Sequence, residues 1–62
     1  MKYEIELHAY SGKKHGIHGD WYYADSIGNA LDYAILNFKH STLYTDYLQS
    51  TPFIIIKSAK RV

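Results

Sequence analysis

The sequence predicts an α+β fold of the order β-β-α-β, with a three-stranded, mainly antiparallel sheet and one helix on one face. Three patterns lead to this prediction. Residues 2–10 alternate between apolar and polar side chains, as in a strand with one buried face. Residues 27–38 repeat apolar side chains at the spacing of a helix that packs on a core. Residues 53–59 form a largely apolar run after Pro52, which is typical of a buried strand.

The first strand is followed by a stretch rich in glycine. The buried face of the strand is predicted to carry Tyr3, Ile5, Leu7 and Ala9. The exposed face is predicted to carry Lys2, Glu4, Glu6, His8 and Tyr10. Residues 11–20 contain three glycines and little periodicity, which predicts either a long loop or a hairpin with a flexible tip. Residues 21–24 are predicted to form a short aromatic strand that pairs with the first.

The helix has a recognisable beginning and end. Its apolar positions are Ile27, Ala30, Leu31, Ala34, Ile35 and Phe38. Asp25 or Ser26 supplies the N-cap, since either side chain can accept a hydrogen bond from a free backbone amide. The pattern ends near Phe38, where Lys39 and His40 suit the negative end of the helix dipole.

Residues 41–51 allow two interpretations, a short helix capped by Ser41 or Thr42, or a loop held by its aromatic side chains. Pro52 ends any helix and precedes the last strand.

We expect the first strand in the middle of the sheet. The run Phe53–Ile56 is apolar on both sides. Either the last strand is central and residues 41–51 fold beneath it, or a second chain covers it through the sheet or an edge.

Length and composition limit how this fold can be stabilised. Sixty-two residues make one domain, residues 1–62. A domain of this size buries only about 60% of the surface that its unfolded chain exposes. The chain has no cysteine, so disulfides and thiolate zinc sites are excluded. Two ways of stabilising so small a domain remain, a metal site made of histidine and carboxylate side chains or a partner chain. We expect a partner chain, in the form of a homodimer.

Charge and hydropathy narrow the class of protein. The net charge of +1 is too small for a dedicated nucleic-acid binder. No apolar run has the length of a signal peptide or approaches the ~20 residues of a membrane span. The sequence therefore predicts a cytoplasmic protein without a membrane partner.

The sequence contains no catalytic or cofactor motif, so we expect neither an enzyme nor a bound cofactor. His15 and His18, with Asp20 close behind, form the one local cluster that resembles a metal site. The spacing alone is a weak signal, and two solvated loop histidines are the favoured interpretation.

The helix has a second apolar surface. Leu36 lies about 180° from Ile27 on a helical wheel, and Tyr33 and His40 lie near it. An isolated exposed leucine is the simpler interpretation. Aromatic residues make up 16% of the chain, and tyrosine and tryptophan are frequent at protein interfaces. The predicted partner-binding residues are Trp21, Tyr22, Tyr23, Tyr33, Leu36, His40, Tyr44 and Tyr47.

Nucleic-acid binding is the alternative function. Its candidate basic residues are Lys13, Lys14, Lys57, Lys60 and Arg61, and its candidate stacking residues are Tyr10, Tyr22 and Tyr23. Glu4 and Glu6 argue against it, because they share a strand face with Tyr10 and would repel phosphates.

The chain as a whole resembles small bacteriophage proteins. The resemblance is carried by Ala24-Asp25-Ser26, followed by Ala30-Leu31 and Ala34, in a short tyrosine-rich chain without cysteine. Such phage proteins bind stoichiometrically to a host enzyme or a bacterial defence system, often as homodimers. The resemblance implies an inhibitor that occupies a surface of a larger host protein in the host cytoplasm, and it assigns no role to any residue.

Overall fold

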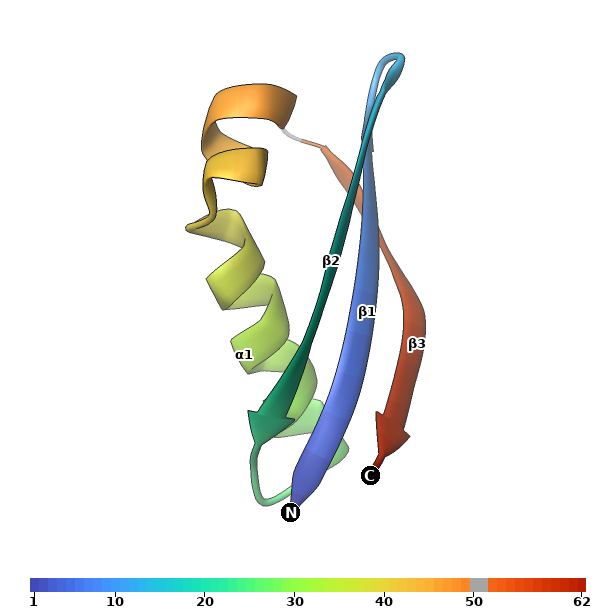
Figure 1. Cartoon of the computed structure of the whole chain (residues 1–62), viewed down its shortest axis with the longest axis vertical. Helices are drawn as coiled ribbons and strands as arrows, with labels where there is room; N and C mark the ends of the chain where they lie inside the picture. The colour runs from blue at the N-terminus through green and yellow to red at the C-terminus, as the bar shows by residue number, and fades with distance from the viewer. Residues whose placement is uncertain (50–51) are drawn as a thin grey trace.

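A three-stranded antiparallel sheet forms one layer of the molecule, and helical segments form the other (Figure 1). The structure is a computed structural model that describes residues 1–49 and 52–62. Its elements are β1 (Lys2–Ser11), β2 (Lys14–Tyr23), α1 (Ile27–Lys39), the π-helical segment η1 (Leu43–Leu48) and β3 (Phe53–Arg61). The predicted α+β fold of the order β-β-α-β is confirmed, with η1 as the additional short helical piece.

β1 is the central strand, as expected. The strand order is β2-β1-β3, and β1 pairs antiparallel with both neighbours. The interpretation in which the last strand is central is therefore wrong, because β3 pairs with β1 on one side and lies at an edge. Tyr3, Ile5, Leu7 and Ala9 are buried between β1 and α1, as their alternation predicted.

The two first strands form a tight hairpin. Ser11 pairs with Lys14, so only Gly12 and Lys13 make the turn. Gly12 has a φ of 61°, which fits the first central position of a type II′ turn. The predicted long loop is wrong, because residues 14–20 belong to β2. The alternative prediction, a hairpin, is correct, and its turn has only two residues. The predicted aromatic strand is the last part of β2.

The helix α1 begins and ends where the sequence placed it. Ser26 is the N-cap, and its Oγ accepts a hydrogen bond from the Asn29 amide at 3.2 Å. His40 caps the other end. The fully buried residues of α1 are Ala30, Ala34 and Phe38.

Residues 41–48 adopt the helical alternative. The Ser41 hydroxyl donates to the Phe38 carbonyl at 2.6 Å and accepts from the Tyr44 amide at 3.3 Å. Thr42, the other candidate cap, makes no side-chain cap bond. Leu48, the last residue of η1, is buried in the core. Residues 50 and 51 of the predicted 41–51 segment lie outside the described residues.

β3 contains a β-bulge. Ile56 pairs with Leu7 and Ser58 pairs with Glu6, so Lys57 is an extra residue with no partner on β1. The bulge shifts the alternation by one residue and keeps Ala59 on the inner face with the core.

The core is small for the apolar content of the chain. Its buried members are Tyr3, Ile5, Leu7, Ala9, Ala30, Ala34, Phe38 and Leu48. Three of the eight are alanines, which contribute little apolar area. Four isoleucines remain at least 40% exposed: Ile17, Ile27, Ile55 and Ile56. The single chain therefore leaves much of its apolar surface in contact with water.

Candidate protein-binding surfaces

The face of the sheet that points away from α1 is open, and we call it the outer sheet face. In Figure 1 both α1 and η1 lie on the opposite side of the strands. The register places these residues on the outer sheet face: Lys2, Glu4, Glu6, His8 and Tyr10 from β1, His15, Ile17, Gly19, Trp21 and Tyr23 from β2, and Phe53, Ile55, Ser58 and Lys60 from β3.

One end of the outer sheet face is apolar. Near the hairpin turn, β1 pairs Tyr10 with Phe53 and His8 with both Ile17 and Ile55. We call Tyr10, Ile17, Phe53 and Ile55 the apolar end; their exposed fractions are 41%, 57%, 70% and 40%. The four exposed apolar side chains surround His8, which pairs with Ile17 on one side and with Ile55 on the other. An exposed apolar patch of this kind is typical of an interaction site.

The other end of the outer sheet face is charged. Glu4 accepts a hydrogen bond from the Trp21 indole N–H at 3.0 Å, and Lys60 lies 3.4 Å from its other oxygen. The Trp21 hydrogen bond, followed by Lys60, holds the pKa of the Glu4 carboxyl below its ordinary value. The Lys2 ammonium lies 4.2 Å from the centre of the Trp21 ring, within range of a cation–π contact.

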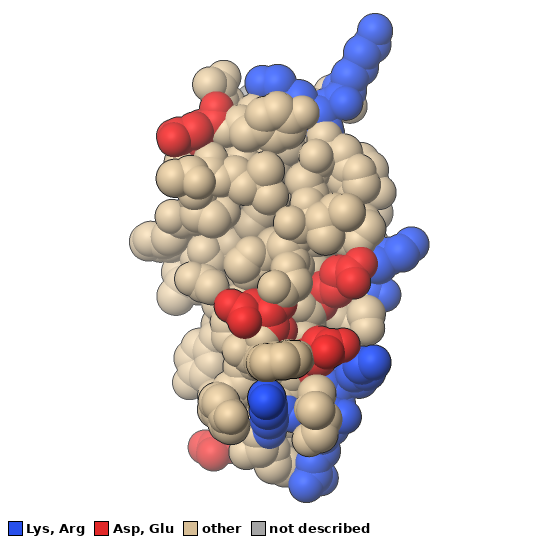
Figure 2. Space-filling view, viewed as in Figure 1, with Lys and Arg blue, Asp and Glu red and all other residues tan. Residues whose placement is uncertain are grey.

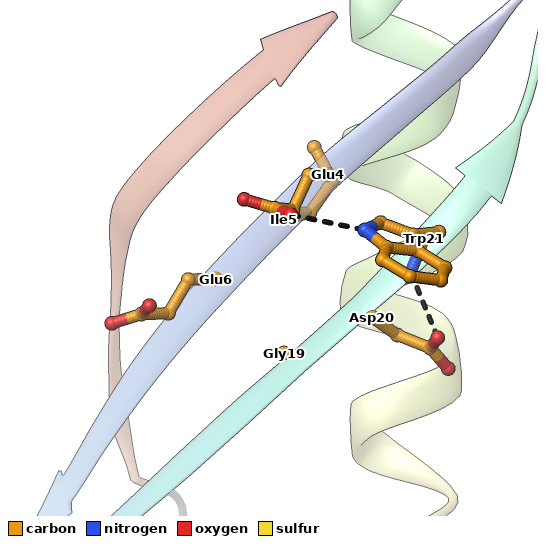
Figure 3. A pocket seen from close by; sticks show the side chains of 6 residues that line it. All are labelled: Glu4, Ile5, Glu6, Gly19, Asp20 and Trp21. Atoms are coloured by element: carbon orange, nitrogen blue, oxygen red, sulfur yellow. Dashed lines mark hydrogen bonds between the residues drawn. The ribbon is translucent and has the colours of Figure 1, made fainter. Parts of the chain in front are cut away.

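A hollow of about 360 Å³ extends from the charged end toward the apolar end. It is lined by Glu4, Ile5, Glu6, Gly19, Asp20 and Trp21 (Figure 3). Gly19 has no side chain to fill the space. Figure 2 shows acidic side chains gathered in the middle of this view and an uncharged area between them and the hairpin turn. The acidic hollow therefore separates the apolar end from the basic side chains at the opposite end.

The outward face of α1 carries a second hollow, of about 350 Å³, which we call the helix hollow. It is lined by Tyr33, Leu36, Asn37 and His40. Tyr33 and Leu36 are 51% and 59% exposed. The structure thus brings together the three residues that the helical wheel grouped, and Asn37 joins them.

The remaining predicted partner-binding residues lie elsewhere. Tyr22 and Tyr44 are half-buried and pack against the core, so neither presents an open ring. Tyr47 is 48% exposed on η1. Trp21 and Tyr23 are exposed at the charged end of the outer sheet face. The eight residues therefore do not form one surface, because the helix hollow and the outer sheet face belong to opposite layers.

His15 and His18 do not share a site. Both lie in β2, three positions apart, so their side chains point to opposite faces of the sheet. His18 stacks on Phe38 in the inner layer and is hydrogen-bonded to the Tyr22 hydroxyl at 2.8 Å. The predicted interpretation of two solvated loop histidines is also wrong, because both belong to a strand. Within residues 1–49 and 52–62, no group of three or more His, Cys, Asp or Glu side chains is placed to hold a metal ion.

The basic residues proposed for nucleic-acid binding are spread along the sheet, with Lys57 at the bulge in the middle of β3 and the other four near the two ends. Lys13 and Lys14 are at the hairpin turn, whereas Lys60 and Arg61 pair with the start of β1. Eight residues of strand separate the two groups, roughly 27 Å. Lys14 donates to the Tyr47 carbonyl at 2.8 Å, and Lys60 faces Glu4. This arrangement gives no support to the nucleic-acid alternative.

Sequence reasoning missed the apolar end as a single surface. Phe53 and Ile55 were recognised as part of an unusual apolar run, but Ile17 lies among glycines, histidines and lysines and gives no strand signal. Only the register of β1 with both neighbours brings these residues to one place.

The helices of this chain are short. Among the residues that the structure describes, no helix has both the length and the apolar character needed to cross a membrane. In comparisons with known proteins, no protein-family model, no curated protein and no solved structure matches the chain.

Proposed function

We propose that the chain is a small, non-enzymatic protein-binding module that forms a homodimer and occupies a surface of a larger protein. The concrete form of the proposal is a phage-type inhibitor of a host or bacterial defence enzyme. The observation that carries it is the apolar end of the outer sheet face, which the chain's own helices leave uncovered.

The apolar end supports a dimer with twofold symmetry. Two sheets that pack face to face bury their apolar side chains between them, as in a sandwich. In a twofold dimer each patch meets its own copy, so apolar residues meet apolar residues. The charged end, with Glu4 and Lys60, then remains in water. Association also stabilises a chain whose core is small, because binding to the folded state shifts the folding equilibrium.

The helix hollow supports a second partner. It lies on the layer opposite the outer sheet face, so a dimer through the sheet leaves it open. Tyr33 supplies a large, rigid contact, and Leu36 supplies an apolar wall. We expect an apolar side chain of the larger protein to enter this hollow.

Two matched substitutions separate the surfaces. Ile17→Asp places a charge in the apolar end, and Leu36→Asp places one in the helix hollow; the two native side chains are 57% and 59% exposed. Light scattering is expected to give a dimer mass for the wild type and for Leu36→Asp, and a monomer mass for Ile17→Asp. Circular dichroism checks that both variants stay folded.

A pull-down from bacterial lysate tests the larger partner. The tagged wild type is expected to retain one protein in stoichiometric amount, and Leu36→Asp is expected to lose it. A wild type that stays monomeric at millimolar concentration would contradict the dimer. Equal retention by the wild type and Leu36→Asp would contradict the helix hollow as the binding surface.

A further inference from the structure

Two histidines from neighbouring strands meet on the outer sheet face. His8 lies on β1 and His15 on β2, at diagonal positions of the pairing. Nδ1 of His8 and Nε2 of His15 are 3.2 Å apart, and the ring centres are 5.1 Å apart. Cross-strand neighbours at this separation can act together on one ligand.

Glu6 fixes the protonation pattern of His8. Its carboxylate lies 2.6 Å from Nε2 of His8 and can only accept a hydrogen bond. Nε2 of a neutral His8 must therefore carry the proton, and Nδ1 keeps a lone pair that faces His15. A carboxylate that holds the far nitrogen of a histidine is the usual support of a metal-binding imidazole, because it orients the ring and raises its basicity.

The His15 ring is also held in place. It stacks on the Tyr10 ring with centres 4.5 Å apart and an angle of 2° between the planes. His15 is exposed, whereas only 13% of the His8 side chain is accessible. One imidazole is thus anchored within the sheet, and the other is fixed by stacking at a position that solvent can reach.

We propose that His8 and His15 form a two-imidazole site for a divalent transition-metal ion, represented by Zn²⁺. Two nitrogens bound at 2.0–2.1 Å with a tetrahedral angle between them lie about 3.3 Å apart, close to the distance between these two atoms. The ion takes the place of the hydrogen bond between His15 Nε2 and His8 Nδ1. The ring proton of His15 moves from Nε2 to Nδ1, so His15 binds the ion as a neutral imidazole. Water completes the coordination, and Glu6 offsets part of the added charge. Imidazole ligands favour zinc, copper and nickel over calcium and magnesium.

Both ligands come from one chain, so the monomer suffices for metal binding. His8 and His15 lie within the apolar end, which the proposed dimer would cover. The titrations are therefore run at a dilution where light scattering gives the monomer mass. The ion would join β1 to β2 close to the hairpin turn. Since the unfolded chain does not hold the two histidines together, zinc is expected to raise the melting temperature.

Isothermal titration calorimetry with zinc chloride tests the site, run alongside NMR spectra of the histidine rings. The wild type is expected to bind one ion per chain, with the largest shifts at His8 and His15. His15→Ala is expected to abolish binding, and Glu6→Gln is expected to weaken it by about tenfold through the loss of the carboxylate. His40→Ala removes an exposed histidine of α1 and serves as the control that keeps wild-type affinity.

The thermal shift supplies a second measurement for any variant that folds poorly. Zinc should raise the melting temperature of the wild type and of His40→Ala, and a chelator should reverse the rise. A wild type that takes up no zinc, or a His15→Ala variant that binds zinc as the wild type does, would overturn the proposal. Both results are obtained on the monomer, so the site and the dimer can fail separately.

Discussion

The side chain of Leu43 rests on the backbone of Gly16. A Cβ atom built on Gly16 would lie 3.0 Å from Cδ2 of Leu43 and 3.1 Å from its Cγ. Gly16 is buried in β2, and Leu43 is the first residue of η1. The missing side chain is therefore what lets η1 pack onto the hairpin.

Replacing Gly16 by alanine should destabilise the protein by about 1–3 kcal/mol, the range for adding a methyl group to a filled core. Leu43 must shift, and η1 moves with it. Gly19→Ala is a matched control on the same strand, since its nearest atom would be the Ile5 carbonyl oxygen at an ordinary 3.9 Å. Urea denaturation measures both variants. Equal stability of Gly16→Ala and Gly19→Ala would show that Leu43 does not constrain position 16.

Phe38→Ala is expected to leave the chain without a cooperative unfolding transition. Phe38 is fully buried, stacks on His18 and meets the edge of the Tyr44 ring. Such a truncation costs about 3–5 kcal/mol, which equals the stability that a core of this size commonly provides. Leu36→Ala on the same helix is the control, because Leu36 is 59% exposed. Near-ultraviolet circular dichroism during heating follows the loss, and a sharp transition in Phe38→Ala would refute it.

Ser26→Ala should lower the stability of the fold by about 1 kcal/mol, because the Asn29 amide loses its partner. Asp25→Ala tests the neighbouring residue that the sequence offered as the other cap. The structure assigns the cap to Ser26, so Asp25→Ala should change stability by less than about 0.5 kcal/mol. Thermal denaturation distinguishes the two, and the reverse order would move the cap to Asp25.

Glu4 should make stability depend on pH in the acidic range. Its pKa is lower in the folded chain than its ordinary value of 4.5, because Trp21 and Lys60 favour the charged carboxylate. The stabilisation is therefore fully present above pH 4.5 and is lost as the pH falls through the lowered pKa. Glu4→Gln should be less stable than the wild type at neutral pH, and the difference should vanish in acid. Urea denaturation at several pH values measures it; a gap that is constant with pH would exclude Glu4.

The elements whose apolar side chains repeat at a regular spacing could be predicted from the sequence. The element that depends on pairing with a neighbouring strand could not. Alternation defined β1, and the helical spacing with its cap defined α1. β2 was missed between Lys14 and Asp20, because its inner face needs a glycine under Leu43 and a histidine over Phe38 rather than aliphatic residues. Its strand conformation depends on β1, not on its own propensity.

One candidate surface could likewise be predicted from the sequence, and the other could not. Tyr33, Leu36 and His40 are close in sequence on one helix, so helical geometry alone grouped them. His8 and His15 belong to different strands, and the register that joins them depends on a two-residue turn at Gly12. The edge position of β3 likewise depends on strand pairing. The apolar run from Phe53 to Ile56 therefore does not indicate which of its side chains remain exposed to solvent.

The extra residue at Lys57 bears on whether the edge of this sheet can pair with other molecules. β3 is an edge strand, so its far edge from Phe53 to Ile56 pairs with no other strand among the described residues. Phe53, Ile55 and Ile56 on this segment are at least 40% exposed. An unpaired edge with apolar side chains can pair with the sheet of another molecule. The β-bulge at Lys57 interrupts the regular edge of β3 after these four residues and twists the rest of the strand. Lys57 also places a positive charge there, which disfavours pairing with another edge strand. A strand of another molecule can pair with only a short segment of β3. Because this pairing cannot continue along the whole strand, the addition of one sheet after another into a polymer is disfavoured.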